Sequence, residues 1–121
     1  MNSDAETLQG TWNIDSLEVE GRKMNRDMFP GAQIIIDGDL FATAGMGAAY
    51  KGTFVVNDTS VPKTIDILFN EGPHSGNSSL GIYELDGDQW KLCLGFAGMS
   101  RPNDFVTSPG SGHALETLTR G

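Results

Sequence analysis

Hydrophobic and polar residues alternate over short runs of this chain, and glycine-containing turns separate the runs. Between residues 49 and 57, for example, Tyr50, Phe54 and Val56 occupy alternate positions. A period of two is typical of a strand that buries one face and leaves the other face wetter. Such runs, rich in β-branched and aromatic residues, predict eight strands. They cover residues 11–19, 32–37, 40–44, 49–57, 64–70, 79–86, 89–96 and 113–120.

The segments between these runs predict how the strands are connected. Residues 37–39 and 86–88 are both Asp-Gly-Asp, which is typical of a tight hairpin turn, and the further ligands of a calcium loop are absent. Only residues 4–9 and 24–29 can form a helical turn or two. A closed barrel removes both sheet edges, whereas a two-sheet sandwich needs longer crossings. We therefore expect an all-β fold: an eight-stranded antiparallel up-and-down barrel with a short helical segment near residues 24–29.

The order of the connections predicts that the two ends of the barrel differ. In a meander the connections alternate between the ends, so the long ones form an open mouth and the short ones a closed end. A phase slip between Ile14 and Leu17 also predicts a β-bulge at residues 15–16 of the first strand. The long connections are 20–31, 45–48, 71–78 and 97–112, and the short ones are 38–39, 58–63 and 87–88.

Composition narrows the classes of partner. The 121 residues fit one domain over residues 1–121, and 8 basic against 16 acidic residues give a net charge of −8. That charge repels phosphate backbones and anionic lipids, so we expect no nucleic-acid partner and no membrane insertion. One cysteine excludes an internal disulfide and a multi-cysteine metal site. The first residues lack a signal-peptide pattern, so we expect a cytoplasmic protein unless an export segment precedes them.

Several stretches of the chain, in this order, resemble the signatures of one family. They are LQGTW at 8–12, SLEV at 16–19, GIYELDGD at 81–88, KLCL at 91–94, Arg101-Pro102, Phe105 and SPGSG at 108–112. In these stretches the chain resembles the small lipocalin-like (calycin-type) domain of unknown function found in planctomycetes and acidobacteria. The resemblance implies structural roles for three residues: Gly10 begins the first strand, Trp12 closes the barrel floor, and Arg120 packs over the Trp12 ring. It implies no activity.

The barrel interior is the leading candidate for a site. Its predicted aromatic lining is Tyr50, Phe54, Phe69, Trp90 and Phe96. An eight-stranded barrel is wide enough either to be filled by side chains or to hold one small ligand. Glycines at 45, 47, 52 and 81 either leave room for a ligand or let the strands bend. The leading hypothesis is a non-catalytic binding module for a small, mostly apolar molecule.

Residues at the predicted mouth would contact a polar group of that ligand. They are Arg22, Arg26, Arg101 and His74. Basic side chains gather at the long connections, while the short turns carry mostly aspartates. The mouth is therefore the end that repels an anionic or carboxylate head less.

Two alternatives stay open: a packed barrel that acts through its surface as a protein-interaction domain, and an enzyme that uses His74, Glu71 and Asp104 at the mouth. We interpret His74 and His113 as surface imidazoles, because no pair of ligands has metal-binding spacing. We interpret Cys93 as a structural or an inert surface cysteine, because an activated thiol needs a positioned base and no histidine lies near it in the sequence. No catalytic residue, metal or cofactor is predicted.

Overall fold

The structure, a computed structural model, describes residues 4–25, 31–45, 50–71, 76–95, 100–110 and 112–120. These residues form one short helix and nine strands. The elements are α1 (Asp4–Thr7), β1 (Gly10–Val19), β2 (Arg22–Asn25), β3 (Gln33–Asp37), β4 (Leu40–Ala44), β5 (Lys51–Asn57), β6 (Lys63–Glu71), β7 (Ser78–Asp86), β8 (Gln89–Gly95) and β9 (His113–Arg120).

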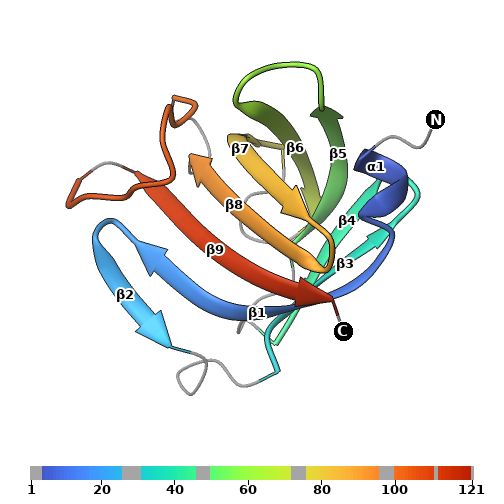
Figure 1. Ribbon diagram of the computed structural model, residues 1–121, viewed down its shortest axis with the longest axis horizontal. Helices are drawn as coiled ribbons and strands as arrows, with labels where there is room; N and C mark the ends of the chain where they lie inside the picture. Colours follow the sequence, from blue (N-terminus) through green and yellow to red (C-terminus); the bar gives the residue numbers. More distant parts are fainter. Residues whose placement is uncertain are drawn as a thin grey trace.

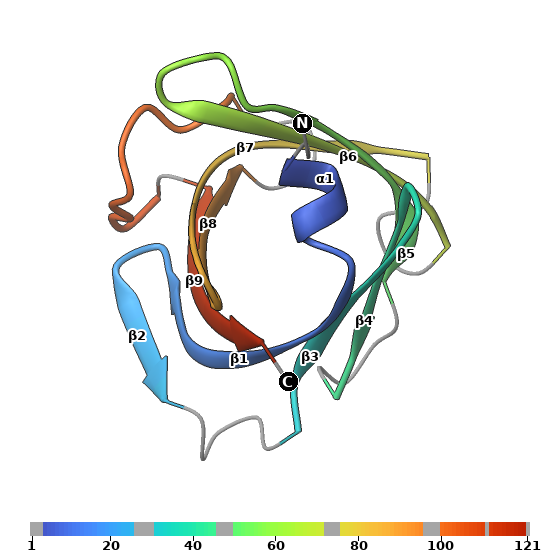
Figure 2. The same ribbon diagram turned by 45° about the vertical axis from the view of Figure 1, so that its right-hand side comes forward.

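Eight of the strands close into an antiparallel barrel (Figures 1 and 2). The order is β1-β3-β4-β5-β6-β7-β8-β9, and pairing of β1 with β9 closes the ring. This confirms the predicted all-β barrel and excludes two separate stacked sheets. The ninth strand, β2, pairs with the second half of β1 and lies outside the ring in Figure 2.

The first strand bends where its pattern of apolar residues slips. The register between β1 and β9 shifts between Ile14 and Ser16, so Asp15 is the extra residue of a β-bulge, as predicted. The bulge keeps Leu17 on the same face as Trp12 and Ile14, because the phase of alternation changes by one residue there.

The prediction of a helical segment near residues 24–29 is wrong for residues 24 and 25. Residues 22–25 form the strand β2, and residues 26–29 lie outside the described residues. The cause is a two-residue turn in which Glu20 and Gly21 both have positive φ angles, of 49° and 83°. Such a turn fits the twist of a hairpin and returns the chain to pair with β1. The helical turn predicted at residues 4–9 does form, as α1.

One end of the barrel is closed by α1 and by side chains of β1 and β9. Figure 2 shows α1 within the outline of the ring. The Trp12 indole N–H donates to the Leu8 carbonyl at 2.9 Å, and the Arg120 guanidinium lies 4.3 Å from the Trp12 ring centroid. Arg120 also donates to the carbonyls of Gln9 and Thr7. Trp12 and Arg120 therefore lie together at this end of the barrel.

The segment 100–110 covers part of the outer wall. Cys93 and Ile82 point outward in the alternation of β8 and β7, yet their side chains are buried. On the same side, the Thr107 hydroxyl donates to the Glu18 carboxylate and accepts from the Gly21 N–H. Of the two interpretations of Cys93, the surface one is wrong and the structural one stands, since the segment shields that face from water.

Candidate functional site

The predicted aromatic lining comes from strands on both sides of the ring. Phe54, Phe69 and Trp90 are buried on the inner face, and Tyr50 packs against the core. The Tyr50 and Phe69 rings are 6.1 Å apart in an edge-to-face arrangement. Trp90 contacts Trp12 near the floor, with 5.5 Å between ring centroids. The fifth predicted lining residue, Phe96, lies outside the described residues.

The described basic residues that were expected at the mouth lie outside the barrel, unlike the aromatic lining residues. Arg26 and His74 lie outside the described residues. Arg22 is exposed on β2, outside the ring. The Arg101 guanidinium donates to the Asp66 carboxylate at 2.6 Å and to the Gly81 carbonyl at 2.8 Å. Asp66 alternates with inward residues of β6, so this ion pair places Arg101 on the outer wall.

The interior does contain one acidic side chain that sequence reasoning missed, Glu116. On β9, Ala114, Glu116 and Leu118 are buried at alternate positions, and Glu116 is only 6% exposed. Its register partners are Leu92 on β8 and Leu17 on β1. The sequence does indicate this site, because Glu116 occupies an inward position of an alternating strand, where an aliphatic residue is usual.

The surroundings of Glu116 change its acid–base behaviour. No described residue hydrogen-bonds its carboxyl group, and burial in an apolar environment raises its pKa from 4.5 to about 7. Close to neutral pH the group is therefore divided between the neutral acid and the carboxylate. A buried ionisable group with a perturbed pKa and no described structural partner is a candidate for function.

A second polar group of the interior also lacks a described partner. The Trp90 indole nitrogen is buried and makes no hydrogen bond to the part of the chain that the structure describes. Trp90 pairs with Leu118, and Leu92 with Glu116, so Trp90 and Glu116 are diagonal neighbours on one inner face. Diagonal pairs of an antiparallel ladder are about 7–8 Å apart. The inner face of β8 and β9 thus carries one donor and one carboxyl group close together.

Two of the inward glycines bring the strands close together. A Cβ at Gly52 would overlap the Leu68 carbonyl oxygen, next to a register shift between Lys51 and Gly52. A Cβ at Gly81 would lie 2.5 Å from the Leu94 Cδ2 atom. Of the two roles considered for these glycines, the structure supports strand bending and close approach at both positions.

The polar groups near α1 are paired with each other. Asp4 accepts from the Lys63 ammonium at 2.9 Å and from the Tyr83 hydroxyl at 2.8 Å. Burial and the neighbouring Asp4 carboxylate raise the pKa of Tyr83 well above its ordinary value, so the hydroxyl stays protonated. These contacts tie α1 to β6 and β7, which indicates a structural role.

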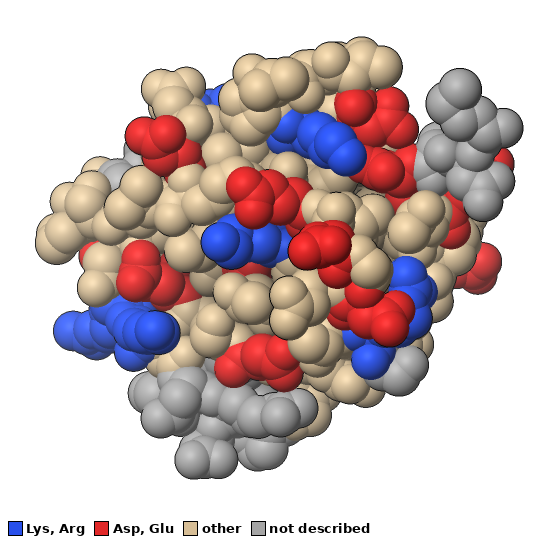
Figure 3. Space-filling model, in the orientation of Figure 1, with Lys and Arg blue, Asp and Glu red and all other residues tan. Residues whose placement is uncertain are grey.

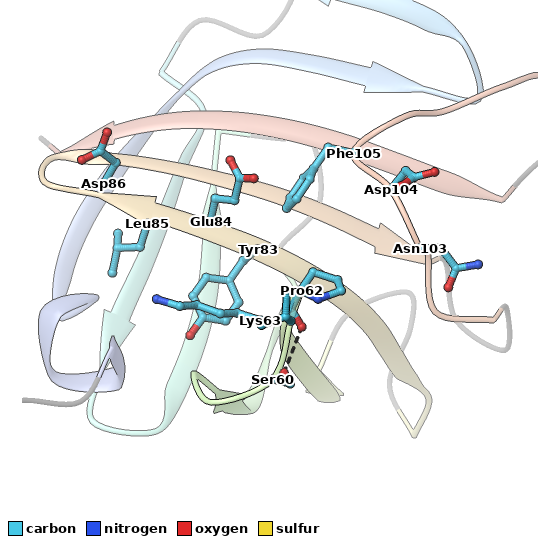
Figure 4. A pocket seen from close by; sticks show the side chains of 11 residues that line it. Ser60, Pro62, Lys63, Tyr83, Glu84, Leu85, Asp86, Asn103, Asp104 and Phe105 are labelled. Atoms are coloured by element: carbon cyan, nitrogen blue, oxygen red, sulfur yellow. Dashed lines mark hydrogen bonds between the residues drawn. The ribbon is translucent and has the colours of Figure 1, made fainter.

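A groove of about 630 Å³ lies on the outside of the barrel (Figure 4). It is bounded by the loop before β6, the end of β7 and residues 103–105. Val61, which is 99% exposed, Leu85 and Phe105 give it an apolar lining. Three acidic side chains flank that lining: Glu84, Asp86 and Asp104.

The carboxylates proposed for an enzyme site are not brought together. Asp104 lines the same outer groove as Lys63, the first residue of β6, whereas Glu71 is the last residue of β6 and pairs with Lys51. Eight residues of extended strand separate these two ends by about 26 Å. Within the described ranges there is no group of three or more metal-ligating side chains. The His113 ring nitrogen lies 3.2 Å from the Ser100 carbonyl oxygen.

The charged side chains are spread over the surface that Figure 3 shows. Lysine and arginine stand next to aspartate and glutamate, and the described basic residues do not gather into a patch on that face. Four described ion pairs, such as Arg120 with Asp88 at 3.1 Å, reflect this mixing. Among the described residues, no helix has the length and apolar character needed to cross a membrane.

Comparisons with protein-family models, with curated protein sequences and with solved structures found no match to this chain. The function is therefore inferred from the geometry of the barrel and the chemistry of its interior.

Proposed function

We propose that this barrel is a non-catalytic binding module that takes a small, mostly apolar molecule into its interior. The observation that carries the proposal is Glu116, a carboxyl group buried on a mostly apolar inner wall without a described partner. Sites for small molecules are mostly apolar and contain a few convergent polar groups. A barrel that only needed a packed core would gain stability from an aliphatic residue at this position.

The closed floor gives such a site a defined depth. Trp12 and Arg120 seal one end, so a ligand would enter from the opposite rim and rest above them. The aromatic rings of Tyr50 and Phe69 would supply contact area on the opposite wall. Burial of apolar ligand surface then provides most of the affinity, at about 25 cal/mol per Å².

We also propose that the chain is a relative of the small lipocalin-like domains that its sequence resembles. The support is the floor: Arg120 stacks on Trp12, and Gly10 begins β1 with a φ angle of 119°, a conformation that favours glycine. Ligand binding by lipocalins is an analogy at the level of the fold. The support for binding by this chain is the chemistry of its own interior.

Native mass spectrometry of freshly purified protein, followed by titration with the neutral fluorophore N-phenyl-1-naphthylamine, tests the binding proposal. The variant Ala114→Trp adds a large side chain to the inner face, and Leu68→Trp adds the same side chain to an exposed outer position. We expect Ala114→Trp to weaken binding at least tenfold and Leu68→Trp to leave it unchanged. Absence of both a co-purified ligand and probe binding in the wild-type protein would refute the proposal.

The outer groove supports a second candidate function, docking of a protein segment. Val61 and Phe105 line one groove together with Glu84, Asp86 and Asp104, and this lining fits a segment that combines an apolar anchor with lysine or arginine. Titration with a lysine-rich peptide containing one leucine tests this. The candidate requires binding that Val61→Ser weakens and that salt reduces.

A further inference from the structure

We infer that the ligand of the barrel interior is a cation: a mostly apolar amine whose ammonium group is bound by the Glu116 carboxylate. The inference rests on the proposed function and specifies the chemical class of the ligand. It replaces the expectation that the mouth binds an anionic group of the ligand. The reason is that Glu116, the ionisable side chain at mid-depth on the described inner wall, is an acid.

The position of Glu116 suits a polar group that is enclosed together with an apolar body. It lies three residues after His113, where β9 begins, and four residues before Arg120 on the floor. At about 3.4 Å per residue, its carboxyl group is about 10 Å along the strand from the beginning of β9. The neighbours on the flanking strands, Leu92 and Leu17, are aliphatic.

The described basic groups on the inner face are already used at the floor. Lys63 donates to the Asp4 carboxylate, and Arg120 stacks on Trp12 and donates to backbone carbonyls. An anionic ligand would therefore meet Glu116 without a described cation to compensate it. An ammonium group would instead form a charge-assisted hydrogen bond with the carboxylate, in a place where water does not compete.

Binding of an amine should depend on pH through Glu116. The ionisable groups around it point to the other side of the wall: Glu18 on β1, and Lys91 and Cys93 on β8. The Glu18 carboxylate accepts from Thr107, and burial raises the pKa of the Cys93 thiol to about 11, so that it stays neutral. Among these neighbouring groups, Glu116 is the one whose pKa burial brings close to neutral pH, at about 7.

The affinity for the amine should rise with pH, because the ammonium group binds the ionised form of Glu116. Below pH 7 the amine must first displace the proton of Glu116, so its affinity falls about tenfold per pH unit. Above pH 7 the carboxylate is already formed, and the affinity levels off. Between pH 5.5 and pH 8 the affinity should rise about 30-fold, whereas that of a neutral ligand should not rise.

Three probes of matched shape test the inference by isothermal titration calorimetry: 2-naphthylmethylamine, 2-naphthylmethanol and 2-naphthoate. We expect the amine to bind at least tenfold more tightly than the alcohol at pH 8, and the carboxylate to bind most weakly. At pH 7, binding of the amine should release about half a proton, which appears as a dependence of the heat on the buffer.

Two variants separate the role of the Glu116 charge from that of the fold. Glu116→Gln should make the amine and the alcohol bind equally and abolish the pH dependence, while Asp39→Asn, at an exposed position of the hairpin between β3 and β4, should change neither. If Glu116→Gln does not fold, Glu116→Asp and the wild-type pH profile decide. Equal binding of amine and alcohol to the wild type would overturn the inference and leave the proposed function standing. Failure of all three probes while N-phenyl-1-naphthylamine still binds would also overturn the inference alone, whereas failure of all four probes in the absence of a co-purified ligand would remove both.

Discussion

Buried polar groups have hydrogen-bond partners at the floor of the barrel, whereas in the middle of its interior they lack described partners. At the floor, Trp12 donates to Leu8, Arg120 covers the Trp12 ring, and Asp4 accepts from Lys63. Further along the same inner face, the groups of Trp90 and Glu116 have no described partner. Satisfied networks make a fold rigid, and unsatisfied buried groups cost stability unless something binds them. The contrast separates the part of this molecule that holds the fold from the part where we propose that a ligand binds.

Removal of the Trp12 ring should give the largest effect, because it breaks the floor. Trp12→Ala deletes a fully buried side chain that contacts Trp90 and Arg120. We expect a loss of about 3–5 kcal/mol in the free energy of unfolding, measured by chemical denaturation. Val61→Ala, at a position that is 99% exposed, serves as a control and should change the stability by less than about 0.5 kcal/mol. Comparable losses for both variants would mean that Trp12 does not hold the floor.

The middle of the interior should respond to pH where the floor does not. Burial raises the pKa of Glu116 in the folded protein to about 7, above its ordinary value of 4.5, so the folded state holds the proton more tightly than the unfolded state. The resulting stability is complete below about pH 4.5 and is lost as the pH rises through 7.

Glu116→Gln carries no charge at any pH and should lack this loss. At pH 8 the variant should be more stable than the wild type by about 3 kcal/mol, relative to the difference between them at pH 4. Denaturant titrations at both pH values measure the change. A constant difference between the two proteins across this range would show that Glu116 is not buried in an apolar environment.

A smaller loss is expected when the ties between α1 and the wall are cut. Asp4→Ala leaves the Lys63 ammonium and the Tyr83 hydroxyl without their shared acceptor. The free energy of unfolding should fall by about 2 kcal/mol, and the pKa of Tyr83 should fall because the neighbouring carboxylate is gone. Denaturation and ultraviolet titration of the tyrosines measure the two effects. Asp39→Ala, in an exposed hairpin, is the matched control.

Alternation along the chain was enough to predict the barrel, whereas the roles of Trp12 and Arg120 at its floor were implied by the family resemblance. Eight one-faced runs have few arrangements that bury every apolar face, and ring closure then brings Trp12 next to Arg120. The bulge at Asp15 could be predicted for the same reason, because a break in phase is visible in the sequence. These features depend on residues that are close in sequence or on the register of neighbouring strands.

Features that depend on packing across the chain could not be predicted in this way. Alternation placed Cys93 on the outer face correctly, but it does not show that residues 100–110 fold back over that face. It showed Arg101 near the long connections without indicating that Asp66 holds it on the outer wall. Glu116 was visible as an inward acid, yet its importance depends on the aliphatic neighbours that adjacent strands supply.

The two tryptophans allow a direct comparison of the floor with the middle of the interior. The expected difference in the free energy of unfolding is the smallest of those predicted. Trp12→Phe removes a donor that pairs with the Leu8 carbonyl and weakens the stack with Arg120, whereas Trp90→Phe removes a donor without a described partner. Both variants lose similar ring area, so the difference between their free energies of unfolding reports on the paired N–H group of Trp12 together with its stack with Arg120. We expect Trp12→Phe to be less stable than Trp90→Phe by about 1–2 kcal/mol. If saturation with 2-naphthylmethylamine stabilises Trp90→Phe and the wild type equally, the Trp90 N–H takes no part in binding, and Glu116 alone supplies the polar contact.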